Sequence, residues 1–151
     1  MYLDKTTEFC DATALSTAAT GLALIGNVMD LTVARDLGQI DDLYFVVTVD
    51  TAVTSGGAAT VSFILASDAQ AAIAVDGSAS EHIVTAAIPK ATLVAGYVAA
   101  AFDLPFEGVP YEEFIGVLQN VGTAALTAGK INAFLTSDVA RWKAVAANTG
   151  F

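Results

Sequence analysis

Short β-branched and aromatic runs, each closed by turn residues, recur along most of this chain. The clearest run is "LYFVVTV" (43–49), which has Asp41-Asp42 before it and Asp50 after it. Further runs of this kind occupy 27–32, 59–66, 81–88, 97–104, 112–121 and 129–136. Val, Ile, Phe and Tyr favour strands, and short strands separated by turn signals are typical of all-β domains. The pattern predicts an all-β, jelly-roll-like β-sandwich of about 7–8 short strands.

A hairpin is predicted around residues 54–58. This segment, "TSGGA", pairs two glycines, which accept the positive φ that tight turns require. In 59–66, apolar and polar residues alternate with the two-residue period of a strand. We therefore expect 43–49 and 59–66 to pair across this turn. The small, polar segment 67–80 follows and is predicted to be a loop.

The apolar run Thr92–Phe102 allows three interpretations, namely a membrane segment, a buried helix or a strand. It is well below the ~18 residues that a membrane-spanning helix needs, and it contains Gly96. Alanine is the best helix former, which leaves a helix open. Pro89 and Pro105 bracket the run, however, and proline cannot donate to a strand ladder. We therefore favour a strand over 97–104.

Composition indicates one domain with a surface poor in charge. The chain has 151 residues, of which 55% are hydrophobic and 15% are charged, and its mean hydropathy is +0.63. A chain of this length is expected to fold as one domain, 1–151, with a large core. Soluble monomers avoid large exposed apolar patches. We expect a second copy or a large partner to cover part of the surface, although alanine and glycine can supply hydropathy without forming such a patch.

The acidic balance argues against two classes of partner. The formal net charge is −10, from 16 acids and 6 bases. The bases are scattered and form no stripe for phosphate contacts, so no direct nucleic-acid binding is expected. The negative charge repels an anionic membrane, and the polar start "MYLDKTTEFCD" does not resemble a secretory signal. We expect a protein that is made and assembled in a bacterial-type cytoplasm.

The residues that usually carry catalysis are few. Cys10 and His82 are the only cysteine and the only histidine, which nearly excludes a zinc site or a Cys–His nucleophile pair. Cys10 has no flanking cations to lower its pKa, so we interpret it as a small buried hydrophobe. His82 is interpreted as a strand residue with a polar partner or solvent. Asp41-Asp42 and Glu112-Glu113 are adjacent on strands, where neighbours point to opposite faces, so neither pair alone forms a two-carboxylate site.

Motifs for other ligands are absent from the sequence. It contains no Asp-rich calcium loop, and "TSGGAAT" lacks the lysine of a phosphate-binding loop. Trp142 is the only tryptophan, whereas carbohydrate clefts usually display several aromatic side chains. The sequence therefore predicts no catalytic residue, no metal and no cofactor.

Several segments, taken in order, are similar to one known family. The start "YLDKTTEFCDAT", the segment "DLGQIDDLYFVVTVDTAVTSGGAATVSFILASD" and the closing "TAGKINAFLTSDVARWKA" resemble the Bbp16-like capsid cement proteins of tailed bacteriophages. The most specific piece is "IPKATLVAGYVAAAFDLPF", which resembles that family's "IP-x-ATL-x-AGY" run. The acidic "VPYEEFIGVLQNV" and the trailing "VAANTGF" depart from the family's pattern.

The resemblance implies a jelly-roll-like fold and a structural, non-enzymatic role. Such proteins, also called decoration proteins, bind the outer surface of a mature icosahedral shell in the virion. They bridge neighbouring major capsid proteins and stabilise the shell against the pressure of the packaged DNA. The resemblance also implies a homo-oligomer, for which we favour a homodimer, with a trimer next.

Candidate contact residues follow from this expected role. A cement protein can use extended arms that add strands or anchor aromatic side chains to a partner. We expect arms over about residues 1–12 and 137–151, the second with a short helix capped by Thr136 or Ser137. Arg and Trp are enriched in binding hot spots. The candidate contacts to the capsid or to a second copy are Tyr2, Leu3, Phe9, Phe106, Tyr111, Arg141 and Trp142. Packing in the core is the alternative for each, above all for Phe9 and Trp142.

Two other function classes stay open. The first is a β-sandwich adhesion or carbohydrate-binding module on a phage tail or surface, which would be favoured by an aromatic platform or a bound calcium ion. The second is a small hydrolase, which would need a pocket with a strained nucleophile or paired acids.

Overall fold

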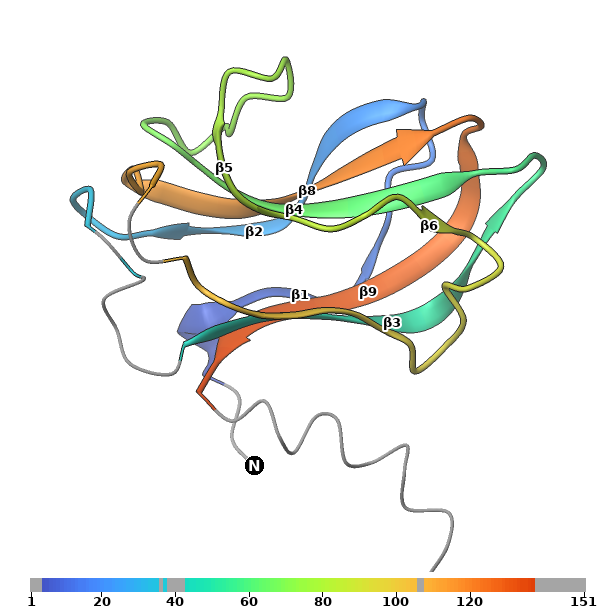
Figure 1. Cartoon of the computed structure of the whole chain (residues 1–151), viewed down its shortest axis with the longest axis horizontal. Helices are drawn as coiled ribbons and strands as arrows, with labels where there is room; N and C mark the ends of the chain where they lie inside the picture. The colour runs from blue at the N-terminus through green and yellow to red at the C-terminus, as the bar shows by residue number, and fades with distance from the viewer. Residues whose placement is uncertain (1–3, 36, 38–42, 106–107, 138–151) are drawn as a thin grey trace, which may run out of the picture.

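The structure, a computed structural model, describes residues 4–35, 37, 43–105 and 108–137 (Figure 1). A 3-10 turn, η1 (Lys5–Thr7), opens the described chain. Strands follow in the order β1 (Glu8–Ala14), β2 (Gly21–Asp30), β3 (Tyr44–Ser55), β4 (Thr60–Asp68), β5 (Ser80–Val84), β6 (Ile88–Pro89), β7 (Val98–Asp103), β8 (Phe114–Gly122) and β9 (Leu126–Thr136). Among these residues, no helix is both long and apolar enough to cross a membrane.

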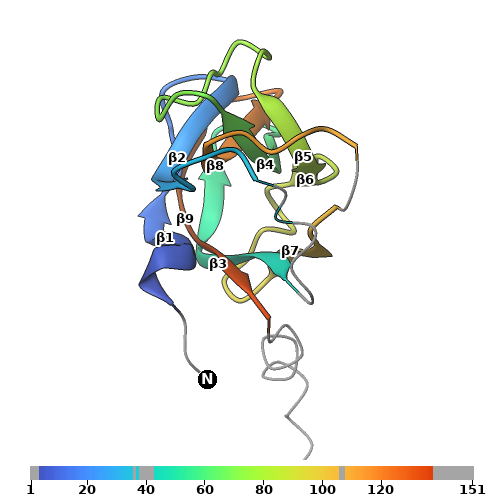
Figure 2. The same cartoon turned by 90° about the vertical axis from the view of Figure 1, so that its left-hand side faces the viewer.

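The strands form two antiparallel sheets that pack face to face (Figures 1 and 2). Sheet A has the order β1-β9-β3-β7, and sheet B has the order β2-β8-β4-β5, with β6 pairing with β4. Successive strands from β1 to β4 alternate between the two sheets, and β7 to β9 return between them. This is the order of a jelly roll, in which two Greek keys wrap one core. The predicted all-β sandwich is confirmed.

The main core fills the space between the sheets. The period-2 alternation of strands turns one side of each sheet inward. Phe45 and Val47 of β3 and Ile131 of β9 enter this core from sheet A, and Phe63 of β4 and Val117 of β8 enter it from sheet B. These five side chains are fully buried.

Sheet B also buries part of its outer face. Ile64 and Ala66 of β4 and Leu118 of β8 point away from the main core and form a second cluster with Ile73. Ile73 belongs to the segment 69–79 between β4 and β5, which lies over the outside of sheet B (Figure 1). The predicted loop over 67–80 is therefore largely correct, and it has a packing role.

The predicted hairpin across 54–58 is wrong. β3 lies in sheet A, paired with β9 and β7, whereas β4 lies in sheet B, paired with β8 and β5. The glycine pair therefore carries the chain from one sheet to the other. Neither glycine has a positive φ, and Gly57 is instead needed for a close approach, because a Cβ there would lie 2.7 Å from Ala124 Cβ. The pairing of β3 and β4 depends on β9 and β8, which are remote in the sequence.

The sequence predicted the positions of the strands better than their pairing partners. The strand preferred for 97–104 is confirmed as β7. The run 27–32 is the end of a longer strand that begins at Gly21, and 81–88 is divided between β5 and β6. β1 was not expected, because its residues were assigned to an arm over about 1–12. Residues from Glu8 onward instead pair with β9, and the helix expected over 137–151 lies outside the described residues apart from Ser137.

Candidate functional site

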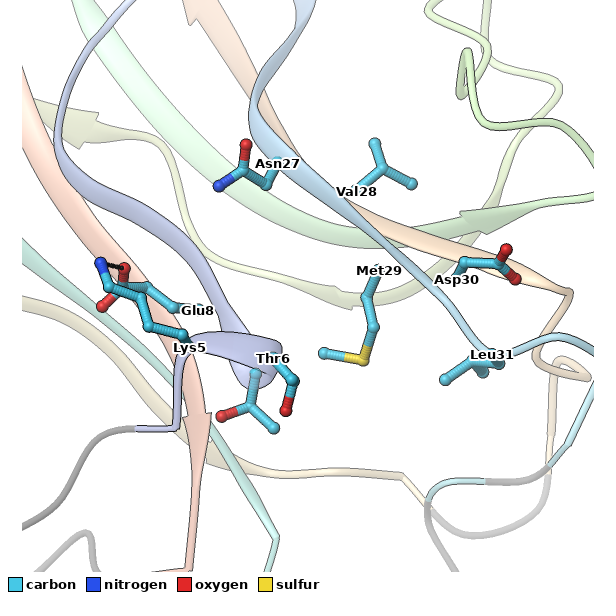
Figure 3. A pocket seen from close by; sticks show the side chains of 9 residues that line it. Lys5, Thr6, Glu8, Asn27, Val28, Met29, Asp30 and Leu31 are labelled. Carbon is cyan, nitrogen blue, oxygen red and sulfur yellow. Dashed lines mark hydrogen bonds and ion pairs between the residues drawn. The ribbon is translucent and has the colours of Figure 1, made fainter.

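A groove lies where β1 and β2, the edge strands of the two sheets, pass one another (Figure 3). Its volume is about 630 Å³. It is lined by Lys5, Thr6, Thr7, Glu8, Asn27, Val28, Met29, Asp30 and Leu31. The groove exists because the sandwich is open on this side, where each sheet ends in an edge strand.

One wall of this groove is η1 and the start of β1. Asp4 caps the turn, because its Oδ1 accepts a hydrogen bond of 2.9 Å from the Thr6 amide. That bond favours the carboxylate and lowers the pKa of Asp4. Lys5 Nζ donates to Glu8 Oε1 at 2.6 Å and lies 3.4 Å from Asp11 Oδ2. The hydrogen bond to Glu8 raises the pKa of Lys5, and this wall carries an ion pair at its exposed surface.

The other wall is the second half of β2. Its pairing with β8 is interrupted between Ile25 and Met29, where a register shift lets Asn27 and Val28 leave the regular ladder. Figure 3 shows the Met29 side chain directed toward η1, between the two walls. An unbranched thioether adapts its shape to irregular surfaces. The groove therefore combines polar groups with an adaptable apolar floor, which suits an extended peptide segment.

A second groove of about 310 Å³ lies at the opposite side of the sandwich, between β5 and β7. It is lined by His82, Ile83, Val84, Phe102, Asp103 and Pro105. Val84 and Phe102 are large apolar side chains that remain 53% and 48% exposed. This side of the molecule therefore presents apolar surface at the end of each sheet.

A hydrogen-bonded network supports the wall of this second groove. The hydroxyl of Ser67, which is fully buried, accepts a hydrogen bond of 3.0 Å from the Glu112 amide and lies 2.7 Å from His82 Nε2. His82 stacks on Tyr111 with ring centroids 3.9 Å apart. The interpretation of His82 as a strand residue with a polar partner is confirmed. The network joins β4, β5 and the segment before β8, and so holds the groove wall in place.

Cys10 lies in the core, as predicted. Only 1% of its surface is exposed. Burial raises the pKa of its thiol from 9.0 to about 11. The thiol is therefore protonated at neutral pH and packs as a small apolar group against β2.

Two candidate contact residues lie inside the fold. Phe9 is 1% exposed and packs edge-on against Phe45 in the main core. Its predicted role as a surface anchor is therefore wrong, and the alternative, packing in the core, is correct. Tyr111 is also buried, and its hydroxyl donates to the Pro105 carbonyl at 3.2 Å. The assignment of Tyr111 as an exposed anchor needs the same correction. Tyr2, Leu3, Phe106, Arg141 and Trp142 lie outside the described residues.

The groove residues were not singled out from the sequence. Met29 and Asn27 line the first groove because β2 loses its register there, and a register shift leaves no mark on the strand pattern. Phe102 lay within the apolar run that was assigned to a strand. The absence of charged residues from 91–101, directly before Phe102, is the sequence feature that could have indicated an exposed edge strand.

The acidic residues that the structure describes do not gather into a metal centre. The described residues contain no group of three or more His, Cys, Asp and Glu side chains that could hold a metal ion. In the adjacent pair Glu112-Glu113, Glu112 Oε1 accepts a hydrogen bond of 2.7 Å from the Ser80 hydroxyl. The pair Asp41-Asp42 lies outside the described residues.

Comparison with known proteins places this sandwich in a family. The Bbp16 family model matches residues 9–135, which run from β1 to the last residues of β9. The chain belongs to the Bbp16 family. No curated protein matches its sequence significantly. The match to the Bbp16 family includes β2, β5, β7 and all of β1 except Glu8, but not the residues 5–8 that form one wall of the first groove.

Proposed function

We propose that this Bbp16-family protein is a bacteriophage capsid cement protein. It binds the outer surface of the mature icosahedral shell, bridges neighbouring major capsid proteins and stabilises the shell against internal DNA pressure. The observation that carries the proposal is the family match, which covers the whole sandwich. The role is structural and non-enzymatic, and its place is the virion.

The two grooves support this role. Both lie at edge strands, where extended segments of a partner can add main-chain hydrogen bonds and insert side chains. A dimer in which each copy keeps one groove free can contact two neighbouring capsid subunits at once. Simultaneous contacts raise the effective concentration of each site, so individually weak contacts give stable attachment. The partners are the major capsid protein and a second copy of this chain.

The test is co-sedimentation of the purified full chain with shells of its own phage that lack this protein. Mature and unexpanded shells are compared across a range of protein concentrations. The proposal expects saturable binding to mature shells at a fixed ratio to capsid subunits, with little binding to unexpanded shells. Mature shells with bound protein are also expected to release DNA at a higher temperature.

Absence of binding to either shell would overturn the proposal. A carbohydrate-binding or adhesion module would then be the next candidate, and a glycan array would test it. A chain denatured and refolded to the same circular dichroism spectrum serves as the folding control.

A further inference from the structure

The edge strand β7 is uncharged along most of its length. It ends the order of sheet A, where its described hydrogen-bonded neighbour is β3. From Ala91 to Phe102 the sequence has no charged residue, and Asp103 closes the strand. An edge strand presents a row of free backbone groups, and natural monomers protect such rows with charges, prolines or bulges. β7 carries little of this protection.

The other edges of the two sheets differ from β7. β1 contains Glu8 and Asp11 and has two register shifts against β9. β5 has five residues and includes Glu81. β2, like β7, has one register shift and ends at an aspartate, but it passes close to β1 at Gly26. The register shift of β7 lies between Val98 and Ala100, so Ala100–Asp103 form its regular part, which is uncharged up to Asp103.

The backbone direction of β7 is fixed by its pairing with β3. The amide of Leu104 donates to the Leu43 carbonyl at 3.0 Å, so Leu104 faces β3. Backbone groups alternate between the two sides of a strand in an antiparallel sheet. Ala101 and Asp103 therefore direct their amides and carbonyls away from β3, toward the free edge.

We propose that two copies of this chain pair through β7, antiparallel, about a two-fold axis at Ala101. The two copies of sheet A then form one continuous sheet across the dimer. This inference deepens the proposed self-association by naming its surface. An interface of this kind is self-complementary, because the same strand supplies both halves.

Charge favours this edge over others. The chain has a net charge of −10, so most approaches of two copies bring like charges together. A two-fold axis at Ala101 places Asp103 opposite Ala99 of the second copy and keeps the two Asp103 carboxylates apart. Phe102 then lies opposite Ala100 of the second copy, whose small side chain leaves room for the half-exposed ring.

Substitution of Ala101 by proline tests the pairing. Proline removes the amide that the dimer needs but no amide that donates to β3. Sedimentation velocity of the full chain should show a dimer for the native protein and for Ala101→Ser, and a monomer for Ala101→Pro. Circular dichroism should show the same fold in all three.

A cysteine at the axis gives a second test that does not depend on proline. Directly opposed residues of a hydrogen-bonded antiparallel pair have Cα atoms about 5.5 Å apart, within the roughly 4.4–6.8 Å that disulfides span. Ala101→Cys should therefore form a reducible dimer under mild oxidation. The exposed Val33→Cys is the matched control and should not, and the buried Cys10 should not react in either variant.

A native chain that remains monomeric at all concentrations would overturn the inference. So would cross-linking of Ala101→Cys no faster than that of Val33→Cys. These outcomes are separable from those of the capsid test. A monomer that saturates mature shells contradicts only the β7 pairing, and a β7-linked dimer that binds no shell contradicts only the cement role.

Discussion

Gln119 is a polar residue in the middle of β8 that is fully buried. Its Oε1 accepts a hydrogen bond of 2.8 Å from the Ser16 amide, and its Nε2 donates to the Ser16 carbonyl at 2.9 Å. Leucine at this position would leave both backbone groups of Ser16 without their partner. We expect Gln119→Leu to lower the free energy of unfolding by about 1–3 kcal/mol, measured by urea denaturation. The exposed neighbour Asn120→Ala should change it by less than about 0.5 kcal/mol, and equal effects would contradict the role of Gln119.

Cys10 predicts a pH dependence of stability. Folding raises the pKa of its thiol from 9.0 to about 11, so the folded state disfavours the thiolate. The contribution of the protonated thiol to the free energy of unfolding is fully present below pH 9.0. It is lost as the pH rises toward about 11. Over this range the free energy of unfolding of the native chain, relative to Cys10→Ala, should fall by up to about 1.4 kcal/mol per pH unit. A difference that stays constant across this range would show that the thiol does not titrate differently in the two states.

At the scale of elements, Gly26 marks the point where β2 crosses close to β1. A Cβ atom at this position would lie 2.2 Å from the Phe9 carbonyl oxygen and 2.5 Å from Cys10 Sγ, and φ is +71°. Gly21 also has a positive φ of +99°, but a Cβ there would meet nothing within 4 Å. Alanine at either site has a backbone cost of roughly 1–2 kcal/mol. Overpacking should add about 1–3 kcal/mol for Gly26→Ala alone.

Thermal denaturation of Gly26→Ala and Gly21→Ala measures this difference directly. Gly26→Ala should have the lower melting temperature. Both variants strain a backbone with positive φ, but only the Cβ at position 26 clashes with β1. If the two variants melt together, the two sheets can separate at this side without loss of stability. The groove between β1 and β2 would then be less rigid than its described walls indicate.

The elements also show why the sequence predicted strands better than their partners. β7 was predicted because glycine and proline bracket it. β3 and β4 were assigned to a hairpin because a glycine turn between two strands has the same appearance whether it joins neighbours or crosses between sheets. β1 was missed because its bulges bury Phe9 and Cys10 in succession, which breaks the alternation that identifies a strand. The grooves were not predicted, since each combines segments that only the fold brings together.

At the scale of the whole molecule, the two sides of the sandwich have different surfaces. The side with β1 and β2 has a polar groove with the Lys5–Glu8 ion pair, and the side with β5 and β7 exposes Val84 and Phe102. Under the proposed functions, the first side is free to bind the shell when the second is paired with another copy. Residues 5–7 lie at the first side, because η1 forms one wall of its groove.

Removal of residues 1–7 separates attachment from folding. The pairing of β1 with β9 begins at Glu8, so the truncated chain keeps all the strands and loses the exposed ion pairs of Lys5 with Glu8 and Asp11. Exposed ion pairs contribute little to stability, so we expect a melting temperature within a few degrees of the native value. Binding to mature shells should weaken at least about tenfold, which corresponds to about 1.4 kcal/mol. Lys5→Ala, which removes only the two ion pairs, is the matched control. Undiminished attachment of the truncated chain would move the shell contact away from this groove.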